Sequence, residues 1–271
     1  MGNKHRGKQR KQGRKPPRRK DAQQKLQDVN NLMDRIIGFV RQGKRARADQ
    51  QLDFLRENSR DRPDLLAKSL CNLAKQIPQP EWKLDLYREA EEFNPSDPVT
   101  LNSYATALAN VGERERAFEL FERSLELKDT ETVTLTSYAT ALANVGERER
   151  AFELFERSLA IDPNNKITLL QFGLFLETQD RCDEAIGYLE KIPLAEIDRR
   201  QAGFVCLNLG RLCYQTNQGH KAEEWFDQAV EYSNDAIATK LNAARHILAL
   251  KPYSREAVAR LKEIVRENTR P

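Results

Sequence analysis

The apolar residues between positions 98 and 131 fall on two helical faces separated by a short turn. The first face has the i, i+3, i+4, i+7 spacing of an α-helix, at Leu101, Tyr104, Ala105 and Leu108. Gly112 interrupts the pattern, and a second face follows at Ala117, Phe118, Leu120, Phe121, Ser124 and Leu125. The pattern therefore predicts a hairpin of two amphipathic helices, each about 12–15 residues long.

The same 23 residues, SYATALANVGERERAFELFERSL, occur twice, from Ser103 to Leu125 and again from Ser137 to Leu159. The two copies are offset by 34 residues, and a repeat of this period is typical of stacked arrays. A single hairpin cannot cover its own apolar stripe, so each hairpin needs a neighbour. We therefore expect one elongated all-α array rather than a single globular core.

The helical phase of these copies continues in both directions along the chain. Hairpins are expected to begin near residues 29, 64, 98, 132, 166, 203 and 237. The step from 166 to 203 is three residues longer than the others near it, which predicts an insertion in a loop around 198–202. The last hairpin carries charged residues on the outer side of its second helix, as a terminal cap requires.

The spacing of small, large and glycine positions resembles the tetratricopeptide repeat family. The matching positions in the first copy are Leu101, Tyr104, Ala105, Leu108, Gly112, Ala117, Phe121, Ser124 and Asp129. The second copy also ends at Pro163, where the family places a proline. The resemblance covers roughly residues 29–270 and implies a right-handed solenoid of stacked helix-turn-helix hairpins. The second helix also resembles a half-repeat family of RNA-processing factors, whose first-helix aromatic signature is missing here.

This organisation predicts four segments: a disordered basic tail over 1–20, a divergent helical hairpin over 21–63, a repeat array over 64–236 and capping helices over 237–271. Within the array, five hairpins are expected, at 64–97, 98–131, 132–165, 166–199 and 203–236.

The charge of the chain is divided between the tail and the array. The chain has a net charge of +4, yet residues 1–20 hold ten Lys and Arg and no Asp or Glu. The remaining 35 basic and 41 acidic residues leave the rest of the chain at −6. The tail has no apolar residue after Met1, so it cannot bury enough surface to fold alone.

Closely spaced cations in the tail favour sequence-independent contact with the phosphates of RNA or DNA. These cations are Lys4, Arg6, Lys8, Arg10, Lys11, Arg14, Lys15, Arg18, Arg19 and Lys20. The run RKPPRRK is also typical of a nuclear import signal in a eukaryote. A third interpretation is a solubilising extension with no dedicated partner.

The family resemblance implies that exposed positions of the first helices face a binding groove. The residues at these positions are Lys68, Asn72, Asn102, Thr106, Asn110, Thr136, Thr140, Asn144, Asn208, Arg211, Tyr214 and Arg245. Asn side chains can donate to and accept from the backbone of an extended peptide, and Arg or Lys can hold a carboxylate. The alternative is a solvated groove without a ligand.

Some family members hold a C-terminal carboxylate with a Lys-Asn-Asn-Lys-Arg set. Lys68 and Asn72 match its first two members, but Ser103, Val133 and Ser137 stand at the other positions. We therefore do not predict binding of a chaperone tail through this set.

Candidate residues for metal binding or catalysis are few. Cys206 and Cys213 are seven residues apart on one helical face, with His220 beyond, and this spacing favours core packing over a metal site. The sequence has no run of 18 apolar residues, which a membrane-spanning helix would require. We therefore expect no cofactor, no catalysis and reduced cysteines in a cytoplasmic protein, or a nuclear one if the source is eukaryotic.

The sequence thus predicts a non-catalytic scaffold that binds a peptide or a protein partner in the groove of a repeat solenoid. The alternative function is a nucleic-acid-associated adaptor whose basic tail contacts the phosphates of RNA, of the ribosome or of DNA. Neither interpretation identifies the partner.

Overall fold

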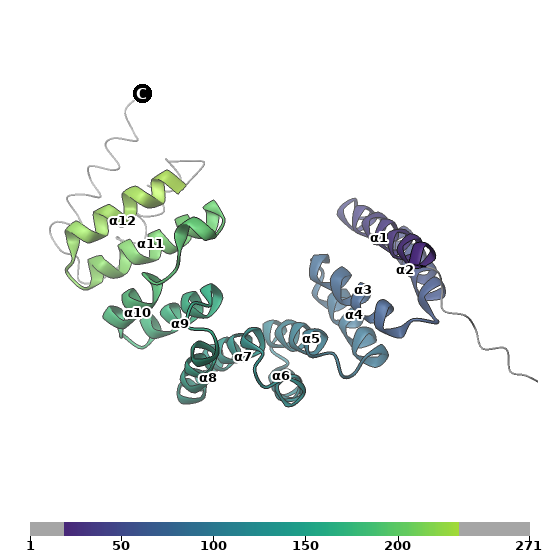
Figure 1. Cartoon of the computed structure of the whole chain (residues 1–271), viewed down its shortest axis with the longest axis horizontal. Coiled ribbons are helices and arrows are strands. Elements are labelled where there is room, and N and C mark those ends of the chain that lie inside the picture. Colours follow the sequence, from purple (N-terminus) through teal and green to yellow (C-terminus); the bar gives the residue numbers. More distant parts are fainter. Residues whose placement is uncertain (1–18, 233–271) are drawn as a thin grey trace, which may run out of the picture. The chain divides into compact units, whose positions relative to one another are not determined.

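The computed structural model describes residues 19–232, which form twelve α-helices, one short 3-10 helix and no β-strand (Figure 1). They belong to two compact units that divide between Pro95 and Ser96. Unit 1 contains α1 (Arg19–Arg41), α2 (Arg45–Ser59), α3 (Pro63–Gln76) and α4 (Pro80–Phe93). Unit 2 contains α5 (Pro98–Val111), α6 (Arg114–Leu127), α7 (Thr132–Val145), α8 (Arg148–Ile161), α9 (Lys166–Thr178), α10 (Cys182–Leu189), η1 (Leu194–Glu196), α11 (Arg199–Gln215) and α12 (Gly219–Tyr232).

Consecutive helices pair as hairpins, and hairpins pack on their neighbours within each unit. In unit 2 the pairs are α5–α6, α7–α8, α9–α10 and α11–α12, and the first helices α5, α7 and α9 also pack side by side. The core consists of the apolar positions that define the repeat in the sequence, and in the first copy Leu101, Tyr104, Ala105, Leu108, Ala117 and Phe121 are all buried. The predicted all-α fold of stacked hairpins is confirmed.

Residues in the left-handed conformation end the first helices of the hairpins in unit 2. Gly112 (φ 89°) and Gly146 (φ 88°) follow α5 and α7. The equivalent positions after α9 and α11 hold Asp180 (φ 60°) and Asn217 (φ 58°). Asp and Asn tolerate this conformation better than other non-glycine residues because their short polar side chains bond locally. The same turn therefore forms with and without glycine.

The helix starts follow capping chemistry. The side chains of Asp97 and Asn165 accept hydrogen bonds from backbone amides three residues later, at 3.0 and 3.1 Å. Asp198 likewise accepts from the Gln201 amide at 3.0 Å and begins α11. The predicted loop insertion around 198–202 is therefore wrong: the extra residues lie in the first turn of α11, because this cap starts the helix early.

The ends of the chain differ in how far they can be compared with the prediction. Arg19 and Lys20, which the predicted tail included, form the first turn of α1. Residues 1–18 and the predicted capping helices over 237–271 lie outside the described residues. Within 19–232, none of the helices combines the length and the apolar character that crossing a membrane would need.

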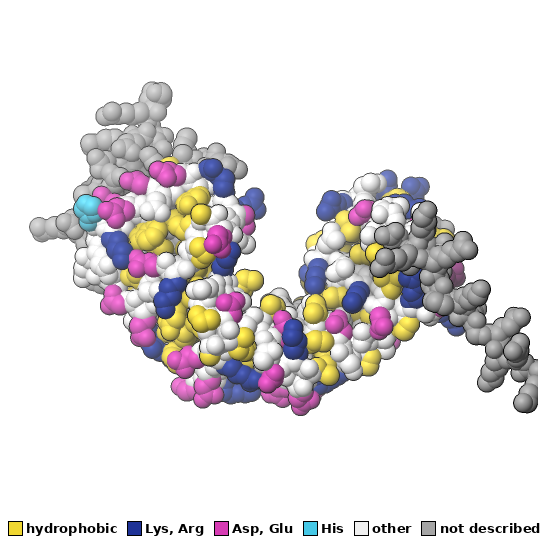
Figure 2. Space-filling model, in the orientation of Figure 1, with side chains coloured by type: hydrophobic (Ala, Val, Ile, Leu, Met, Phe, Trp, Pro, Cys, Tyr) yellow, Lys and Arg dark blue, Asp and Glu magenta, His cyan; other side chains and the backbone are white. Residues whose placement is uncertain are grey.

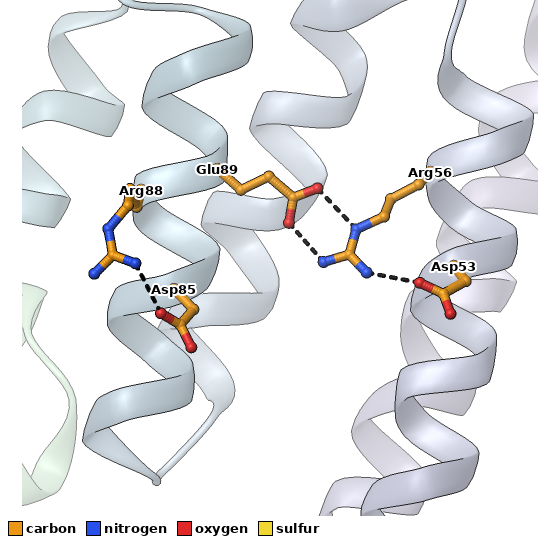
Figure 3. A network of polar contacts seen from close by, with 5 residues as sticks. All are labelled: Asp53, Arg56, Asp85, Arg88 and Glu89. Atoms are coloured by element: carbon orange, nitrogen blue, oxygen red, sulfur yellow. Dashed lines mark hydrogen bonds and ion pairs between the residues drawn. The ribbon is translucent and has the colours of Figure 1, made fainter.

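In unit 1, an ion pair joins α2 to α4 (Figure 3). The Arg56 guanidinium donates two hydrogen bonds to the Glu89 carboxylate, at 2.8 and 2.6 Å, and a third to Asp53 at 2.8 Å. The hydrogen bond with Glu89 is the main cause that raises the pKa of Arg56. On the outer side of α4, Arg88 pairs with Asp85 at 3.0 Å.

Candidate functional site

Five of the residues predicted to face a partner line one pocket in unit 2, hereafter the unit 2 pocket. They are Thr106, Asn110, Thr136, Thr140 and Asn144, from the first helices α5 and α7. The pocket has a volume of about 560 Å³, within the range of small-ligand and peptide side-chain sites. Phe118 and Phe121 of α6 and Ile167 and Gln171 of α9 also line it.

The lining of the unit 2 pocket combines apolar side chains with amides and hydroxyls and is almost uncharged. Arg114 is its single charged residue. The hydroxyls of Thr106 and Thr140 donate to the carbonyls of Asn102 and Thr136, at 2.9 and 2.8 Å. Asn110 and Asn144 are exposed, so each amide can both donate to and accept from a ligand. Such a lining suits the backbone of a peptide better than a charged group.

An exposed apolar side chain recurs at the equivalent position of each first helix in unit 2, and these four residues are hereafter called the apolar row. Its members are Val99, Val133, Ile167 and Phe204, which are 52%, 47%, 60% and 47% exposed. The first three are 34 residues apart, and Phe204 follows after 37 because of the longer α11. The sequence analysis did not identify this row, although comparing equivalent positions of successive repeats would have found it. Hydrophobic side chains also lie among charged ones on the viewed face of unit 2 (Figure 2).

Four predicted groove residues are buried rather than exposed: Asn102, Thr136, Asn208 and Tyr214. The Thr136 hydroxyl lies 2.7 Å from that of Thr168 and 3.2 Å from that of Ser158, so it links α7 to the two neighbouring helices. The prediction that these four positions are exposed is wrong, because their helix faces turn towards the adjacent helices.

Arg211 is also engaged within the chain. Its guanidinium forms a two-point ion pair with Glu177 of α9 and donates to the Asn208 side chain at 3.0 Å. The side chains of Arg211 and Glu177 are only 13% and 18% exposed. The pair therefore holds α11 against α9, and a ligand carboxylate would have to compete with Glu177.

The remaining predicted residues are not part of the lining of this pocket. Lys68 and Asn72 are exposed on α3 of unit 1. Arg245 lies outside the described residues, as do the tail cations up to Arg18. The pocket is thus lined by five of the predicted groove residues, and the structure does not bring the others together in one site.

Three buried titratable side chains of the first helices are neutral at physiological pH. Burial raises the pKa of the Tyr138 hydroxyl to about 12, helped by its 2.9 Å hydrogen bond to Glu122. Burial likewise raises the pKa of the Cys206 and Cys213 thiols to about 11. Both cysteines are fully buried, which confirms that they occupy core positions. Among residues 19–232, no three His, Cys, Asp or Glu side chains are grouped as metal ligands.

Residues 205–235 match the family model of the tetratricopeptide repeat, whereas no curated protein matches the sequence. Among solved structures, PilF of Pseudomonas aeruginosa is 18% identical with a TM-score of 0.58, and the match covers 76% of this chain and 93% of that one. PilW, a type IV pilus biogenesis factor, is 14% identical with a TM-score of 0.59, over 87% of this chain and 99% of that one. A thermophilic repeat protein of Thermus thermophilus is 18% identical with a TM-score of 0.53, over 69% of this chain and 98% of that one.

These structural likenesses show that the chain shares the all-α fold of stacked helical hairpins with these proteins. Together with the repeat matched over residues 205–235, they confirm the resemblance predicted from the sequence, and the chain shares the fold of these solved structures.

Proposed function

We propose that unit 2 binds an extended segment of a protein partner across the first helices α5, α7 and α9. The observation that carries this proposal is the convergence of Asn110 and Asn144 with the threonine hydroxyls in one pocket that has a single charged residue. A folded partner would have to place individual polar side chains opposite these amides and hydroxyls. The backbone of an extended peptide supplies donors and acceptors along its whole length.

The spacing of the helices also predicts a preference in the sequence of the bound peptide. Packed helices lie about 8–10 Å apart, and an extended peptide advances about 3.3 Å per residue. A peptide that crosses the first helices therefore passes one helix for about every three residues. Because the apolar row repeats once per hairpin, we expect the ligand to place an apolar side chain at every third residue.

The duplicated hairpins allow a controlled test of this proposal. Peptides would be selected from a random library on the full chain, and their affinities measured by fluorescence anisotropy. We expect the double variant Asn110→Arg with Asn144→Arg to bind the selected peptides at least about tenfold more weakly, because two large cations fill the amide positions. Thr130→Arg, in the exposed turn before α7, adds the same type of charge outside the pocket and serves as control.

Two results would contradict the proposal. One is equal binding of the selected peptides to the double variant and to wild type, which would place the peptide site elsewhere. The other is a similar loss of peptide affinity in Thr130→Arg, which would show that added positive charge alone weakens binding. Selected peptides without an apolar side chain at every third residue would contradict the spacing alone.

A further inference from the structure

Unit 1 contains a second pocket, of about 450 Å³, formed by α1, α2 and the start of α3, hereafter the unit 1 pocket. It lies in a different unit from the peptide site proposed above and does not depend on it. Its wall combines an apolar part with two arginines and a buried hydroxyl. This combination has no counterpart in the unit 2 pocket, which holds a single charged side chain.

The apolar part of the unit 1 pocket consists of buried and exposed side chains. Val29 and Leu32 of α1 are buried, with 7% and 3% of their surface exposed. Phe54 of α2 lines the same pocket and is 51% exposed. An aromatic ring left half in water at a pocket wall gains stability when an apolar ligand covers it.

The charged part of the unit 1 pocket carries an excess of positive charge. Arg35 and Arg62 line it, and neither forms an ion pair within residues 19–232. Arg35 only donates a long hydrogen bond, 3.4 Å, to the Asn31 carbonyl. The acidic residue of the lining is Asp28, whose carboxylate already accepts from Gln24 at 3.1 Å. The two guanidiniums therefore have free donors, and an anion would be attracted to them.

Ser59 supplies an independent indication of a ligand. Its side chain lines the pocket, is only 1% exposed, and its hydroxyl has no hydrogen-bond partner in the structure. Buried hydroxyls are almost always paired, because an unpaired one loses its water without compensation. A ligand oxygen in the pocket would give this hydroxyl the acceptor that the chain does not provide.

We propose that the unit 1 pocket binds a carboxylate with an apolar body of about the size of one aromatic residue. The apolar body would cover Phe54, and the carboxylate would accept hydrogen bonds from Arg35, Arg62 and Ser59. The volume suits one such group rather than a folded segment. A free carboxylic acid and the last residue of a peptide chain both have this chemistry.

The proposal is tested by isothermal titration of the full chain with 3-phenylpropionate and with its uncharged amide, 3-phenylpropanamide. We expect the acid to bind and the amide to bind at least about tenfold more weakly, because the charged hydrogen bonds are lost. A peptide ending in phenylalanine with a free carboxylate, beside the same peptide as an amide, distinguishes the two sources. Tighter binding of the free peptide than of 3-phenylpropionate would assign the site to chain ends, and the reverse to small acids.

Variants locate the binding in the unit 1 pocket. Arg62→Gln should weaken binding of the acid about tenfold, whereas Arg60→Gln, on the exposed neighbouring residue outside the pocket, should leave it unchanged. Ser59→Ala should raise the melting temperature of the free protein, since it removes an unpaired hydroxyl, yet weaken binding several-fold. A purely structural serine would not produce these opposite effects.

Three outcomes would overturn the proposal. The first is equal affinity for the acid and the amide. The second is equal weakening by Arg62→Gln and Arg60→Gln, which would show attraction to net charge alone. The third is that neither the small acid nor the free peptide gives a heat of binding in the titration, or that Ser59→Ala leaves their binding unchanged.

Discussion

Asn102 and Thr136 occupy equivalent positions in the two nearly identical hairpins, and both are buried. Thr136 donates to the Thr132 carbonyl at 2.8 Å and belongs to a hydroxyl cluster with Ser158 and Thr168. The side-chain oxygen of Asn102 is buried without a hydrogen-bond partner. The same structural environment thus satisfies the threonine hydroxyl and leaves the asparagine oxygen unpaired.

We expect Asn102→Thr to raise the free energy of unfolding by about 1 kcal/mol, because it removes an unpaired buried acceptor. The reciprocal change, Thr136→Asn, should lower it by about 1–3 kcal/mol, since it breaks the cluster and inserts a larger amide. Urea denaturation followed by circular dichroism measures both. Changes of the same sign in the two variants would show that the hydroxyl cluster does not decide the difference.

Residue-level positions were only partly predictable from the sequence. The periodicity identified which residues are apolar and buried, because burial follows the helical period. It could not separate Thr136, whose buried hydroxyl bonds to the neighbouring hairpin, from Thr140, which is more exposed in the same pocket. The two lie one helical turn apart, and the distinction depends on how the hairpins pack. The pairing of Arg211 with Glu177 was equally hidden, because it depends on how α11 packs against α9.

At the scale of single helices, alanine substitutions at two helical glycines separate the effect of close packing from that of helix propensity. A Cβ atom added at Gly210 of α11 would lie 2.7 Å from the Phe226 ring, whereas one at Gly187 of α10 meets nothing within 4 Å. We expect Gly210→Ala to destabilise the protein by about 1–3 kcal/mol through overpacking. Gly187→Ala should stabilise it by up to about 1 kcal/mol through helix propensity. Thermal unfolding compares them, and a stable Gly210→Ala would show that α11 and α12 adjust freely.

The ion pair between α2 and α4 allows a second comparison at this scale (Figure 3). The Glu89 side chain is 21% exposed and bonds Arg56 across two helices, while Asp85 is 60% exposed and pairs with Arg88 on the same helix. Glu89→Gln should lower the free energy of unfolding by about 1 kcal/mol, and Asp85→Asn by less than about 0.5 kcal/mol. Chemical denaturation at low and high salt measures both. Equal effects would mean that the link between the helices adds nothing to an exposed pair.

Helix boundaries show why some elements were predicted better than others. Gly112 marked its turn in the sequence because glycine tolerates a positive φ. Asp180 and Asn217 adopt the same conformation, but these residue types occur in many environments and gave no signal. Asp198 was interpreted as part of a loop, since a capping role becomes visible only when its side chain is seen to bond the Gln201 amide.

For the whole molecule, the contacts between hairpins join residues about one repeat apart. Examples are the bonds between Arg56 and Glu89, Thr136 and Thr168, and Arg211 and Glu177, which span 33, 32 and 34 positions. In such a chain, stability is close to a sum of hairpin terms and nearest-neighbour terms. The 34-residue offset in the sequence therefore predicted which elements lie side by side. It could not predict the division into two units at Pro95, which depends on the packing at each junction.

This division leads to a prediction about truncated chains. We expect the fragment 96–271 to keep the helical signal and the unfolding midpoint of unit 2, because its hairpins retain the neighbours on which they pack within the unit. The fragment 132–271, which lacks α5 and α6, should unfold at a clearly lower temperature. It loses Phe121, whose ring stacks on Tyr138 at 5.1 Å, and exposes the face of α7 that packs on α5. Circular dichroism with thermal denaturation compares both fragments with the full chain.

If removal of 1–95 lowered the unfolding midpoint of unit 2 as much as removal of 1–131, the units would not be independent. The stability of unit 2 would then depend on hairpins beyond its own nearest neighbours, contrary to the additive description of the chain.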